Sequence, residues 1–469
     1  LGICGDWKDP YSTMKFDSEA KIMSEIGKFL MNRGLYRGVK PVMWSTVEKT
    51  ALAEAEIEYH EHKSTTIYVK FPINKTEIKD LINSNIIIWT TTPWTIPGNR
   101  AVAYKGNFKY FLIEVLSTRE DSIAKISDKI IVEEELLDTF IKETLIDKYN
   151  VKLKLEGNDL EGTILKHPLS NKGYNFDVPL LEADFVTNEQ GTGFVHIAPG
   201  HGADDFDLGR KYSLPTPETV EDDGFLKENL PLFGGLHVLR DNEKMADILN
   251  ENDCLIGRGN INHSYPHSWR SKAPLIFRTT PQWFISMTEN DLRKKSLKSI
   301  SETKFFPPQG AKRLSSMIES RPDWCISRQR AWGVPIGIFY NKKTFEPLRD
   351  QDVLDKVIKS FKDHGADAWY KFDASFFLGE KYNTEDYVKV TDIADVWFDS
   401  GSTHTYVLED RNDLKWPASL YLEGTDQHRG WFHSSLLESC GTRGVAPFES
   451  VLTHGFVLDE NGRKMSKSL

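Results

Sequence analysis

The sequence of 469 residues is 39% hydrophobic, 12% aromatic and 27% charged, which is typical of a folded globular protein and excludes a disordered chain. Its length predicts about three domains of roughly 150 residues each. The longest apolar runs fall far short of the roughly 20 residues that span a bilayer, and no signal peptide opens the chain. We therefore expect a cytoplasmic protein that contacts no membrane.

The net charge and the cysteine positions limit the expected nucleic-acid contacts, disulfide bonds and zinc sites. With 59 basic and 69 acidic residues, the net charge of −10 argues against non-specific coating of nucleic acid, because such coating needs clustered lysine and arginine. Any RNA contact is therefore expected to be local. The cysteines form no CxxC pair and predict reduced thiols, without a disulfide framework or a local zinc knuckle; they are Cys4, Cys254, Cys325 and Cys440.

The first predicted elements are a helix and then a β-rich region. Residues 16–35 carry apolar side chains at helical spacing and stop near Gly34, which predicts a helix followed by a cap. From about Thr65 to about residue 250, short runs rich in β-branched and aromatic residues alternate with Pro, Gly and Asn. This texture predicts a separate β-rich domain.

A threonine-rich segment, TTTPWTIPGN, lies inside this β-rich region. Residues 86–89 are typical of a buried strand, and three hydroxyls follow it before Pro93 must end the strand pairing. Small donors and acceptors around a bent backbone suit a small polar ligand, although a strand that simply runs into a turn is the alternative. The polar side chains of the segment are Thr90, Thr91, Thr92, Thr95 and Asn99.

A second segment, GTGFVHIAPGHGADDF, combines two histidines with two acids. It predicts a strand at residues 194–198, a Pro-Gly turn and a helix that begins near Ala203. Asp204 and Asp205 then fall in the first helical turn, where carboxylates complement the helix dipole. A carboxylate held at a rigid terminus close to His196 and His201 is also a natural partner for an ammonium group, so both interpretations remain open.

Beyond residue 281, strands and helices are predicted to alternate as they do around a parallel sheet. The apolar run SLYL at residues 419–422 is a candidate strand, and ligands in such sheets bind beyond the carboxyl ends of the strands. Ligand-binding side chains are therefore expected next, with capping groups and core aromatics as the alternative. The candidates are Trp397, Glu423, Gly424, Asp426, Gln427 and Trp431.

The C-terminal segment FVLDENGRKMSKS places two lysines after a predicted turn at Asn461 and Gly462. Lys464 and Lys467 are mobile cations of the kind that can follow the charge that develops during adenylyl transfer. A solvated basic segment is the alternative. The glycine-rich motifs of P-loop and dinucleotide-binding proteins do not occur in the sequence.

Several long motifs resemble class I aminoacyl-tRNA synthetases, and within them the isoleucyl-tRNA synthetase family. They are KMSKS, YLEGTDQHRGWF, WCISRQRAWGVPI, DVWFDSGSTH, TTTPWTIPGN and GTGFVHIAPGHGADDF, and the resemblance runs along the whole chain. It implies an α/β fold: part of a Rossmann-like parallel-sheet catalytic domain with an inserted, barrel-like β-rich editing domain. The implied divisions are 1–50 for the end of the first catalytic half, 51–250 for the editing domain, 251–285 for the return connection and 286–469 for the second catalytic half.

The resemblance also implies roles for individual residues. The isoleucine pocket and the aminoacyl-adenylate would be held by Trp397, Glu423, Gly424, Asp426, Gln427 and Trp431. ATP would be bound by Lys464, Met465, Ser466, Lys467 and Ser468, with the two lysines acting in catalysis. Hydrolytic editing would use Thr90, Thr91, Thr92, Thr95, Asn99, His196 and Asp205. His196 would limit side-chain size, and Asp205 would hold the α-amino group of the substrate.

The implied ligands are isoleucine, ATP with Mg²⁺, tRNA(Ile), and valine as the edited non-cognate amino acid, in a protein that works as a monomer. The HIGH-like motif of the family does not occur in the sequence, so we expect a piece of a longer enzyme that makes no adenylate alone. Ser45, Glu48, His267 and Ser268 stand where many members carry cysteines, so no zinc is expected in this chain and no residue is assigned as a metal ligand. A valine-specific relative, disfavoured by DQHRGWF, and a tRNA-binding module without activity are the alternatives.

Overall fold

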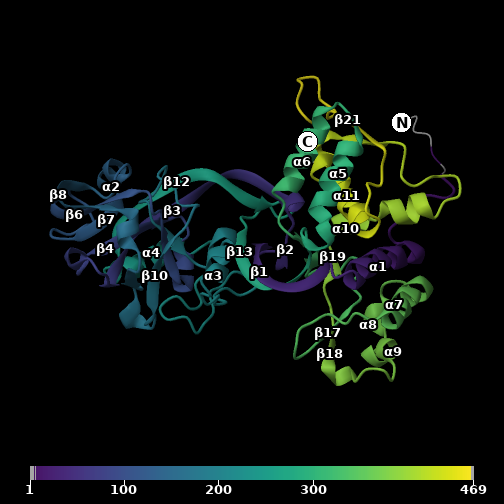
Figure 1. The fold of residues 1–469 in the computed structure, drawn as a ribbon, viewed down its shortest axis with the longest axis horizontal. Coiled ribbons are helices and arrows are strands. Elements are labelled where there is room, and N and C mark those ends of the chain that lie inside the picture. The colour runs from purple at the N-terminus through teal and green to yellow at the C-terminus, as the bar shows by residue number, and fades with distance from the viewer. Residues whose placement is uncertain (1–4, 6, 466–469) are drawn as a thin grey trace. The chain divides into compact units, whose positions relative to one another are not determined.

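The computed structural model describes residue 5 and residues 7–465. The chain folds into two compact units, each built from discontinuous segments (Figure 1). Unit 1 contains Leu1–Val39, Thr50–Ala55 and Pro281–Leu469, and unit 2 contains Lys40–Lys49 and Glu56–Thr280. Among the described residues, no helix has the length and apolar character needed to cross a membrane.

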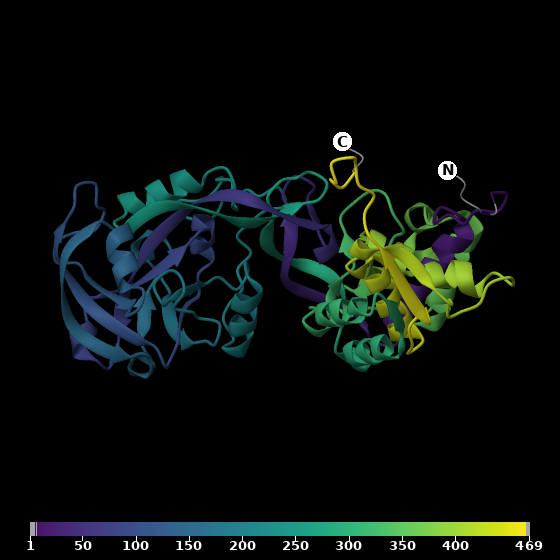
Figure 2. The ribbon, with the colours of Figure 1, turned by 90° about the horizontal axis from the view of Figure 1, so that it is seen from above.

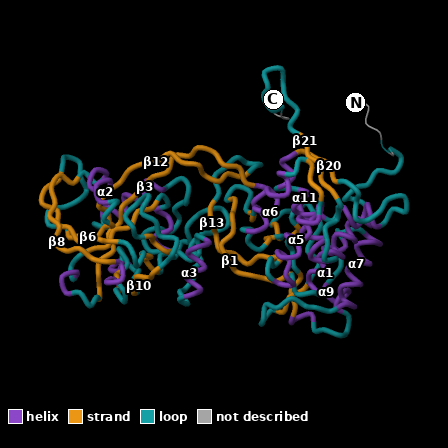
Figure 3. Tube along the Cα trace, turned by 45° about the horizontal axis from the view of Figure 1, so that its top comes forward, coloured by secondary structure: helices purple, strands orange, loops and turns teal. Residues whose placement is uncertain are grey.

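Unit 2 is dominated by strands, whereas most of the helices belong to unit 1 (Figure 3). Its ten-stranded sheet is mixed, with strand order β11-β5-β10-β9-β3-β4-β7-β6-β8 and β12 paired to β3. The strands are β3 Ile57–Lys75, β4 Asn85–Thr90, β5 Ala101–Tyr104, β6 Lys109–Thr118, β7 Lys129–Glu133, β8 Ile146–Glu156, β9 Ile164–Lys166, β10 Asp177–Glu182, β11 Val195–Ile197 and β12 Leu255–Ser268. The prediction of a β-rich region after Thr65 is therefore confirmed.

The long strand β3 organises this sheet. It pairs antiparallel with β12 along most of its length, so that Ile57 lies opposite Ser268 and Val69 opposite Leu255. Most of its central residues are β-branched or aromatic and are buried on both faces, which is where such side chains pack best in a sheet. The helices of unit 2 are α2 Leu137–Glu143, α3 Ala203–Lys211 and α4 Asn242–Glu251.

Unit 1 places helices around a small parallel sheet of order β14-β21-β20 (Figure 2). Its strands are β14 Lys304–Phe306, β20 Tyr421–Gly424 and β21 Ser450–His454. The helices are α1 Phe16–Met31, α5 Leu292–Glu302, α6 Gln309–Glu319, α7 Gln351–His364, α8 Ala368–Lys371, α9 Ala374–Leu378, α10 Val396–Gly401 and α11 Trp431–Thr442. One hydrophobic core joins these helices to the sheet.

The remaining strands complete the fold. A four-stranded sheet has the order β15-β13-β1-β2, and two further pairs are β16 with β19 and β17 with β18. These strands are β1 Leu35–Ser45, β2 Thr50–Ala51, β13 Ile276–Ile285, β15 Trp324–Cys325, β16 Ser327–Arg328, β17 Phe339–Asn341, β18 Tyr387–Lys389 and β19 Ile393–Ala394. The whole is a mixed α/β protein with one large mixed sheet.

Two predicted boundaries are wrong. The helix predicted over residues 16–35 ends at Met31, because Arg33 takes a left-handed conformation with φ of 67° and Leu35 already begins β1. The strand predicted at residues 419–422 is Tyr421–Gly424, because its pairing with β21 starts at Tyr421 opposite Val451. Glu423 and Gly424 therefore lie within the strand and not beyond it.

Candidate functional site

The threonine segment forms one wall of a pocket in unit 2. β4 ends at Thr90, opposite Ile67 of β3, and Pro93 then starts a 3-10 helix, Pro93–Gly98. This bend folds three hydroxyls together. Thr90 Oγ1 lies 3.1 Å from Thr92 Oγ1, and Thr95 Oγ1 donates to the Thr92 carbonyl at 2.8 Å.

His196 of β11 closes the pocket as a fixed, neutral ring. Its Nδ1 accepts from the Asn99 side-chain amide at 2.9 Å, and its Nε2 lies 2.8 Å from Thr95 Oγ1. Because an amide NH₂ can only donate, the ring proton sits on Nε2 and is donated to the threonine hydroxyl. Burial, reinforced by the neighbouring His201 and His167, lowers the pKa of His196 to about 3. The imidazole is therefore uncharged at neutral pH and locked from both sides.

Asp205 supplies the charge of the pocket from the first turn of α3, which begins at Ala203 as the sequence predicts. Its Oδ2 accepts from the Ala198 backbone N–H at 2.8 Å, which fixes the carboxyl group above the end of β11. Burial raises the pKa of Asp205 to about 7, and the nearby Asp204 adds to the rise. A nearby cation favours the ionised form of such a buried carboxyl group, so Asp205 is well suited to bind one.

The pocket that these groups enclose has a volume of about 160 Å³. It is lined by Trp89, Thr90, Thr92, Thr95, Val195, His196, Ala198, His201 and Asp205. The other two residues predicted for this site lie outside the lining. Asn99 contacts the site through its hydrogen bond to His196, and Thr91 takes no part in the lining. A volume below the roughly 300–1,000 Å³ of drug-sized sites suits an amino-acid side chain and its amine better than a nucleotide.

His201 lines the same pocket and was not predicted as a site residue. Its Nε2 lies 2.6 Å from Thr219 Oγ1 and its Nδ1 lies 3.0 Å from the Phe277 carbonyl. The ring packs edge-on against Trp94. Because both ring nitrogens are engaged, His201 is a structural wall, and its position in the turn before α3 was the only signal in the sequence.

A larger pocket of about 540 Å³ shares Trp89 with the first one. Its walls combine aromatic rings with acceptors and donors, and the Tyr68 hydroxyl donates to Glu143 at 2.6 Å. It is lined by Thr66, Tyr68, Trp89, Leu136, Thr139, Glu143, Thr187, Glu189, Gln190, Gly191, Asn260 and Ile261. Sequence reasoning missed this pocket, because its residues come from segments far apart in the chain that meet only through the sheet.

The raised pKa of Asp205 predicts a pH-dependent stability. Because the folded-state pKa of about 7 exceeds the ordinary value of 3.8, the group stabilises the fold at low pH, and this contribution is lost as the pH rises from about 4 through 7. Asp205→Asn, which cannot ionise, is therefore expected to be more stable than the wild type at pH 8 by on the order of 2 kcal/mol, and equal to it near pH 4. Urea unfolding at both pH values measures this difference.

The exposed neighbour Asp204 supplies the matched control for this measurement. Asp204→Asn should change stability little at either pH. If the two asparagine variants behave alike, Asp205 does not titrate as a buried group.

The second candidate site lies in unit 1, at the carboxyl end of β20. Gly424 ends the strand, and Asp426 and Gln427 follow on a 3-10 turn, Thr425–His428. A Cβ on Gly424 would lie 2.5 Å from Asp426 Oδ1, so only glycine lets the Asp426 carboxylate fold back over the strand end. The Gln427 amide donates to Asp426 at 3.0 Å, and its oxygen accepts from the Trp431 N–H at 2.9 Å. Glu423 is exposed on the strand.

The two predicted tryptophans occupy different places. Trp397 lines a nearly filled pocket of about 10 Å³, whereas Trp431 stacks on Tyr421 with ring centroids 4.2 Å apart and lies outside this lining. The pocket is lined by Ala53, Ala55, Arg321, Trp324, Asp395, Trp397, Arg429, Gly430, His433 and Ser434. Sequence reasoning missed all three of Arg321, Arg429 and His433. Arg429 belongs to the YLEGTDQHRGWF motif, whereas Arg321 and His433 lie just outside the quoted motifs.

Asp395 holds the Trp397 backbone in place at the start of α10. It caps α10 by accepting from the Trp397 backbone N–H at 3.2 Å, and its Oδ2 accepts from the Trp324 indole at 3.0 Å. The same oxygen lies 3.1 Å from the Arg328 guanidinium. Asp395 and Arg328 are 0% and 2% exposed, so this ion pair is shielded from water.

The predicted lysine segment follows a tight turn. The Asp459 and Arg463 backbones pair across the turn, and Gly462 has the left-handed φ of 74° that glycine tolerates, which confirms the predicted turn. The Lys464 ammonium lies 3.7 Å from the Phe456 ring centroid, and Met465 is exposed. The remaining residues predicted to bind ATP, Ser466, Lys467 and Ser468, lie outside the described residues.

Ser45, Glu48 and Ser268, where no zinc is expected, are linked by hydrogen bonds. The Ser268 hydroxyl donates to Glu48 Oε1 at 2.5 Å, and the Glu48 backbone N–H donates to Ser45 Oγ at 3.1 Å. The same carboxylate oxygen also accepts from the Ser271 backbone N–H at 3.2 Å. Over residues 5 and 7–465, no group of three or more His, Cys, Asp and Glu side chains is arranged to hold a metal ion.

Comparisons with known proteins extend over the whole chain. The model of the family "tRNA synthetases class I (I, L, M and V)" matches residues 1–469. An isoleucine–tRNA ligase of Pelagibacter ubique is 56% identical over 469 residues, covering 100% of this chain and 51% of the relative. That of Gluconobacter oxydans is 54% identical over 483 residues, covering 100% of this chain and 50% of the relative. The chain spans about half the length of the curated relatives it matches.

A solved structure, the ternary complex of Agrobacterium radiobacter K84 LeuRS with tRNA and LeuAMS, aligns with 97% of this chain and 54% of its own. The identity is 15% and the TM-score 0.34, too low to support a structural argument. The family match over every residue does not depend on that alignment. The chain therefore belongs to the class I tRNA synthetases of the isoleucine, leucine, methionine and valine group.

Proposed function

We propose that this chain is the editing module and second catalytic half of a cytoplasmic, monomeric isoleucine–tRNA ligase. The complete protein would use ATP with Mg²⁺ to form isoleucyl-adenylate and transfer isoleucine to tRNA(Ile). The editing domain, residues 51–250, would hydrolyse valine that was attached in error. The observation that carries the editing proposal is the small pocket in which the Asp205 carboxylate faces the locked, neutral His196.

The pocket supports hydrolysis of an aminoacyl ester. Asp205 would hold the α-ammonium group by a charge-assisted hydrogen bond, and His196 would set the depth available to the side chain. The threonine hydroxyls can orient both the ester and the attacking water. The 540 Å³ pocket that shares Trp89 is large enough for the terminal nucleoside of the tRNA.

Selectivity explains why such an enzyme needs a second pocket. A hydrophobic pocket distinguishes one methylene group by only about 1–3 kcal/mol, a limit for which isoleucine and valine in this family are the standard example. A pocket that admits isoleucine therefore also admits valine. A smaller pocket that hydrolyses valyl esters and excludes isoleucyl esters corrects this error.

In unit 1 we propose that Trp397 and Trp431 border the isoleucine pocket and that Lys464 and Lys467 neutralise ATP phosphates. Glu423, Gly424, Asp426 and Gln427 would hold the adenylate. We further propose that residues 286–469 form the Rossmann-like second half of the catalytic domain and that the editing domain is barrel-like. Residues 251–285 would connect the editing domain to this second half. Residues 1–50 would be the end of the first catalytic half. Strand β3 pairs with β4, β9 and β12 and shifts register near Ile73, which supports a curled sheet.

The test is deacylation of Val-tRNA(Ile) and Ile-tRNA(Ile) by this chain. We expect hydrolysis of the valyl ester and stability of the isoleucyl ester. A chain that binds tRNA and hydrolyses neither ester would be a tRNA-binding module. Equal hydrolysis of both esters would contradict the size-excluding role of the pocket.

The size limit predicts a gain of activity. His196→Ala removes the buried ring that closes the pocket, so the isoleucine side chain should fit and hydrolysis of Ile-tRNA(Ile) should rise by about tenfold or more. Val-tRNA(Ile) should still be hydrolysed. Single-turnover deacylation of both esters measures the ratio.

Thr219→Ala is the matched control for this variant. It removes a hydroxyl that contacts His201 and leaves His196 in place. Should it admit isoleucine as readily as His196→Ala does, general loosening of the pocket, and not the His196 ring, sets the limit.

A further inference from the structure

Helices α10 and α11 are joined by two side-chain hydrogen bonds. Near the start of α11, the Trp431 indole N–H donates to the Ser400 carbonyl at 3.0 Å. Further along, the Ser402 hydroxyl, directly after α10, donates to Glu438 Oε2 at 2.6 Å. α10 carries Trp397, so these two bonds tie the helix that bears this indole to α11.

Two glycines make the contact between the helices close. A Cβ on Gly401 would lie 1.9 Å from Glu438 Oε1, and a Cβ on Gly430 would lie 2.8 Å from the Trp397 ring. The Glu438 carboxyl group therefore fills the space that a side chain at position 401 would need. Because the two helices pack this closely, α10 cannot shift without also displacing the Trp397 indole.

Glu438 is fully buried and faces other acids. Glu25 and Asp399 lie close enough to disfavour its charge, and burial raises the pKa of Glu438 well above its usual range. Oε1 has no hydrogen-bond partner among the described residues. Its surroundings therefore disfavour the charged form of the carboxyl group, whose Oε2 accepts from the Ser402 hydroxyl.

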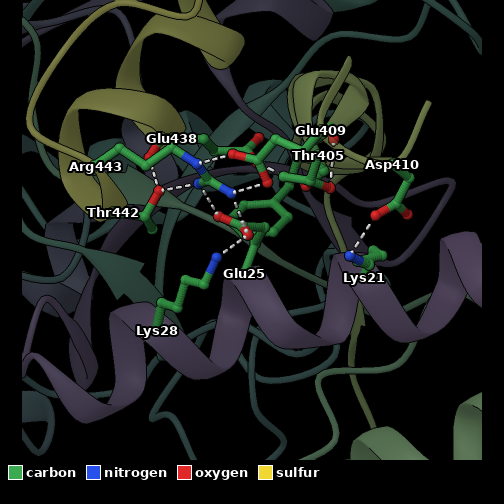
Figure 4. Close-up of polar contacts among 11 residues, drawn as sticks. Lys21, Glu25, Lys28, Thr405, Glu409, Asp410, Glu438, Thr442 and Arg443 are labelled. Carbon is green, nitrogen blue, oxygen red and sulfur yellow. Dashed lines mark hydrogen bonds and ion pairs between the residues drawn. The ribbon is translucent and has the colours of Figure 1, made fainter. Parts of the chain in front are cut away.

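Arg443, the cation near Glu438, forms ion pairs with other acids (Figure 4). Arg443 lies 2.7 Å from Glu25 of α1 and 2.5 Å from Glu409 of the π-helical turn His404–Glu409. Lys28 lies 2.6 Å from Glu25. These pairs hold the C-terminal end of α11 between α1 and the turn, while Glu438, one turn earlier on the same helix, is left to bond with Ser402.

We propose that Glu438 is a positioning residue for the amino-acid pocket: its bond to Ser402 holds α10 against α11 and thereby sets the place of the Trp397 indole. This inference rests on the proposed function, in which Trp397 borders the isoleucine site. Loss of the bond releases the end of α10, and the indole moves relative to Gly430. Because small misplacements at a binding wall change recognition strongly, isoleucine binding is affected more than ATP binding.

The chain offers a closely matched pair of serines for the test. Ser402→Ala removes the hydroxyl that bonds to Glu438, and Ser439→Ala removes an equally buried hydroxyl of α11 that donates to the Val445 carbonyl at 2.7 Å. Both variants of the full-length protein are assayed by isoleucine-dependent ATP–pyrophosphate exchange and by thermal unfolding. We expect Ser402→Ala to raise the KM for isoleucine about fivefold or more with the KM for ATP unchanged, and Ser439→Ala to leave both constants unchanged.

Glu438→Gln completes the design, since a neutral amide keeps the acceptor that Ser402 needs and should keep the KM for isoleucine near the wild-type value. Equal effects of the two serine variants on that KM would overturn the proposal. Hydrogen exchange gives a readout independent of activity: Ser402→Ala should speed exchange of the α10 amides, and Ser439→Ala should not. A wild-type protein without isoleucine-dependent exchange would overturn the proposed function, and amide exchange would still decide the role of Glu438.

Discussion

Replacing Asp205 with alanine is expected to slow hydrolysis of Val-tRNA(Ile) by about a hundredfold or more. Among the described residues that line the small pocket, Asp205 is the only acid, and the Ala198 N–H holds its carboxylate in place. Without it, the α-ammonium group of the substrate would enter a partly desolvated pocket unpaired, at a cost of about 2–5 kcal/mol. Single-turnover deacylation over a range of enzyme concentrations separates loss of binding from loss of rate.

Asp204→Ala is the control for this loss. Asp204 precedes Asp205 in the same helical turn but is exposed and lies outside the pocket lining. Removing it takes a similar charge from the same helix terminus, so the effect on the helix dipole is matched. A comparable loss in both variants would mean that the negative charge of the turn, and not a contact with the substrate, supports hydrolysis.

Asp395→Ala is expected to destabilise unit 1 by about 3–5 kcal/mol. The substitution removes the cap of α10 and the ion pair that Asp395 forms with the buried Arg328 guanidinium. Breaking a buried ion pair from one side costs more than the intact pair contributes, because the remaining ion has lost its hydration as well. Urea unfolding, followed by amide exchange in α10 so that unit 1 is observed separately, measures the loss.

The double variant Arg328→Met with Asp395→Leu separates the two causes. It removes both charges and fills much of the space, so a large part of the lost stability should return. The missing helix cap should still cost about 1 kcal/mol. If the double variant is as unstable as Asp395→Ala, packing around the Asp395 side chain, and not the broken ion pair, accounts for the effect.

Local chemistry made parts of the fold predictable. The strand before Thr90, the start of α3 at Ala203 and the turn at Gly462 all depend on residues next to one another in the chain. Pro93 stops strand pairing, and glycine takes a left-handed turn that other residues avoid. The threonine, histidine and aspartate residues of the small pocket could be predicted as one site because they lie in two short sequence motifs.

Features that depend on distant contacts escaped prediction. The start of β20 at Tyr421 is set by its partner β21, some thirty residues later in the chain, as Tyr421 lies opposite Val451. Trp431 stacks on Tyr421 and donates to the Ser400 carbonyl, contacts that no local pattern specifies. The pocket beside Trp89 draws on residues from Thr66 to Ile261. No short stretch of sequence contains all the residues of this pocket, because the pairing of strands in the sheet brings them together.

The pairing of α1 with α7 bears on how the chain acquires its fold during synthesis. The apolar face of α1, with Ile22, Met23 and Ile26 fully buried, belongs to the core that also contains Leu354 of α7, and Arg349 bonds to the Leu30 carbonyl across 319 positions. A ribosome adds residues at about 5–20 per second, so α1 waits tens of seconds for its partner. The continuous segment Glu56–Thr280 of unit 2 emerges in that interval and can fold first. We expect nascent chains arrested before α7 to recruit a chaperone to α1 while unit 2 already resists protease.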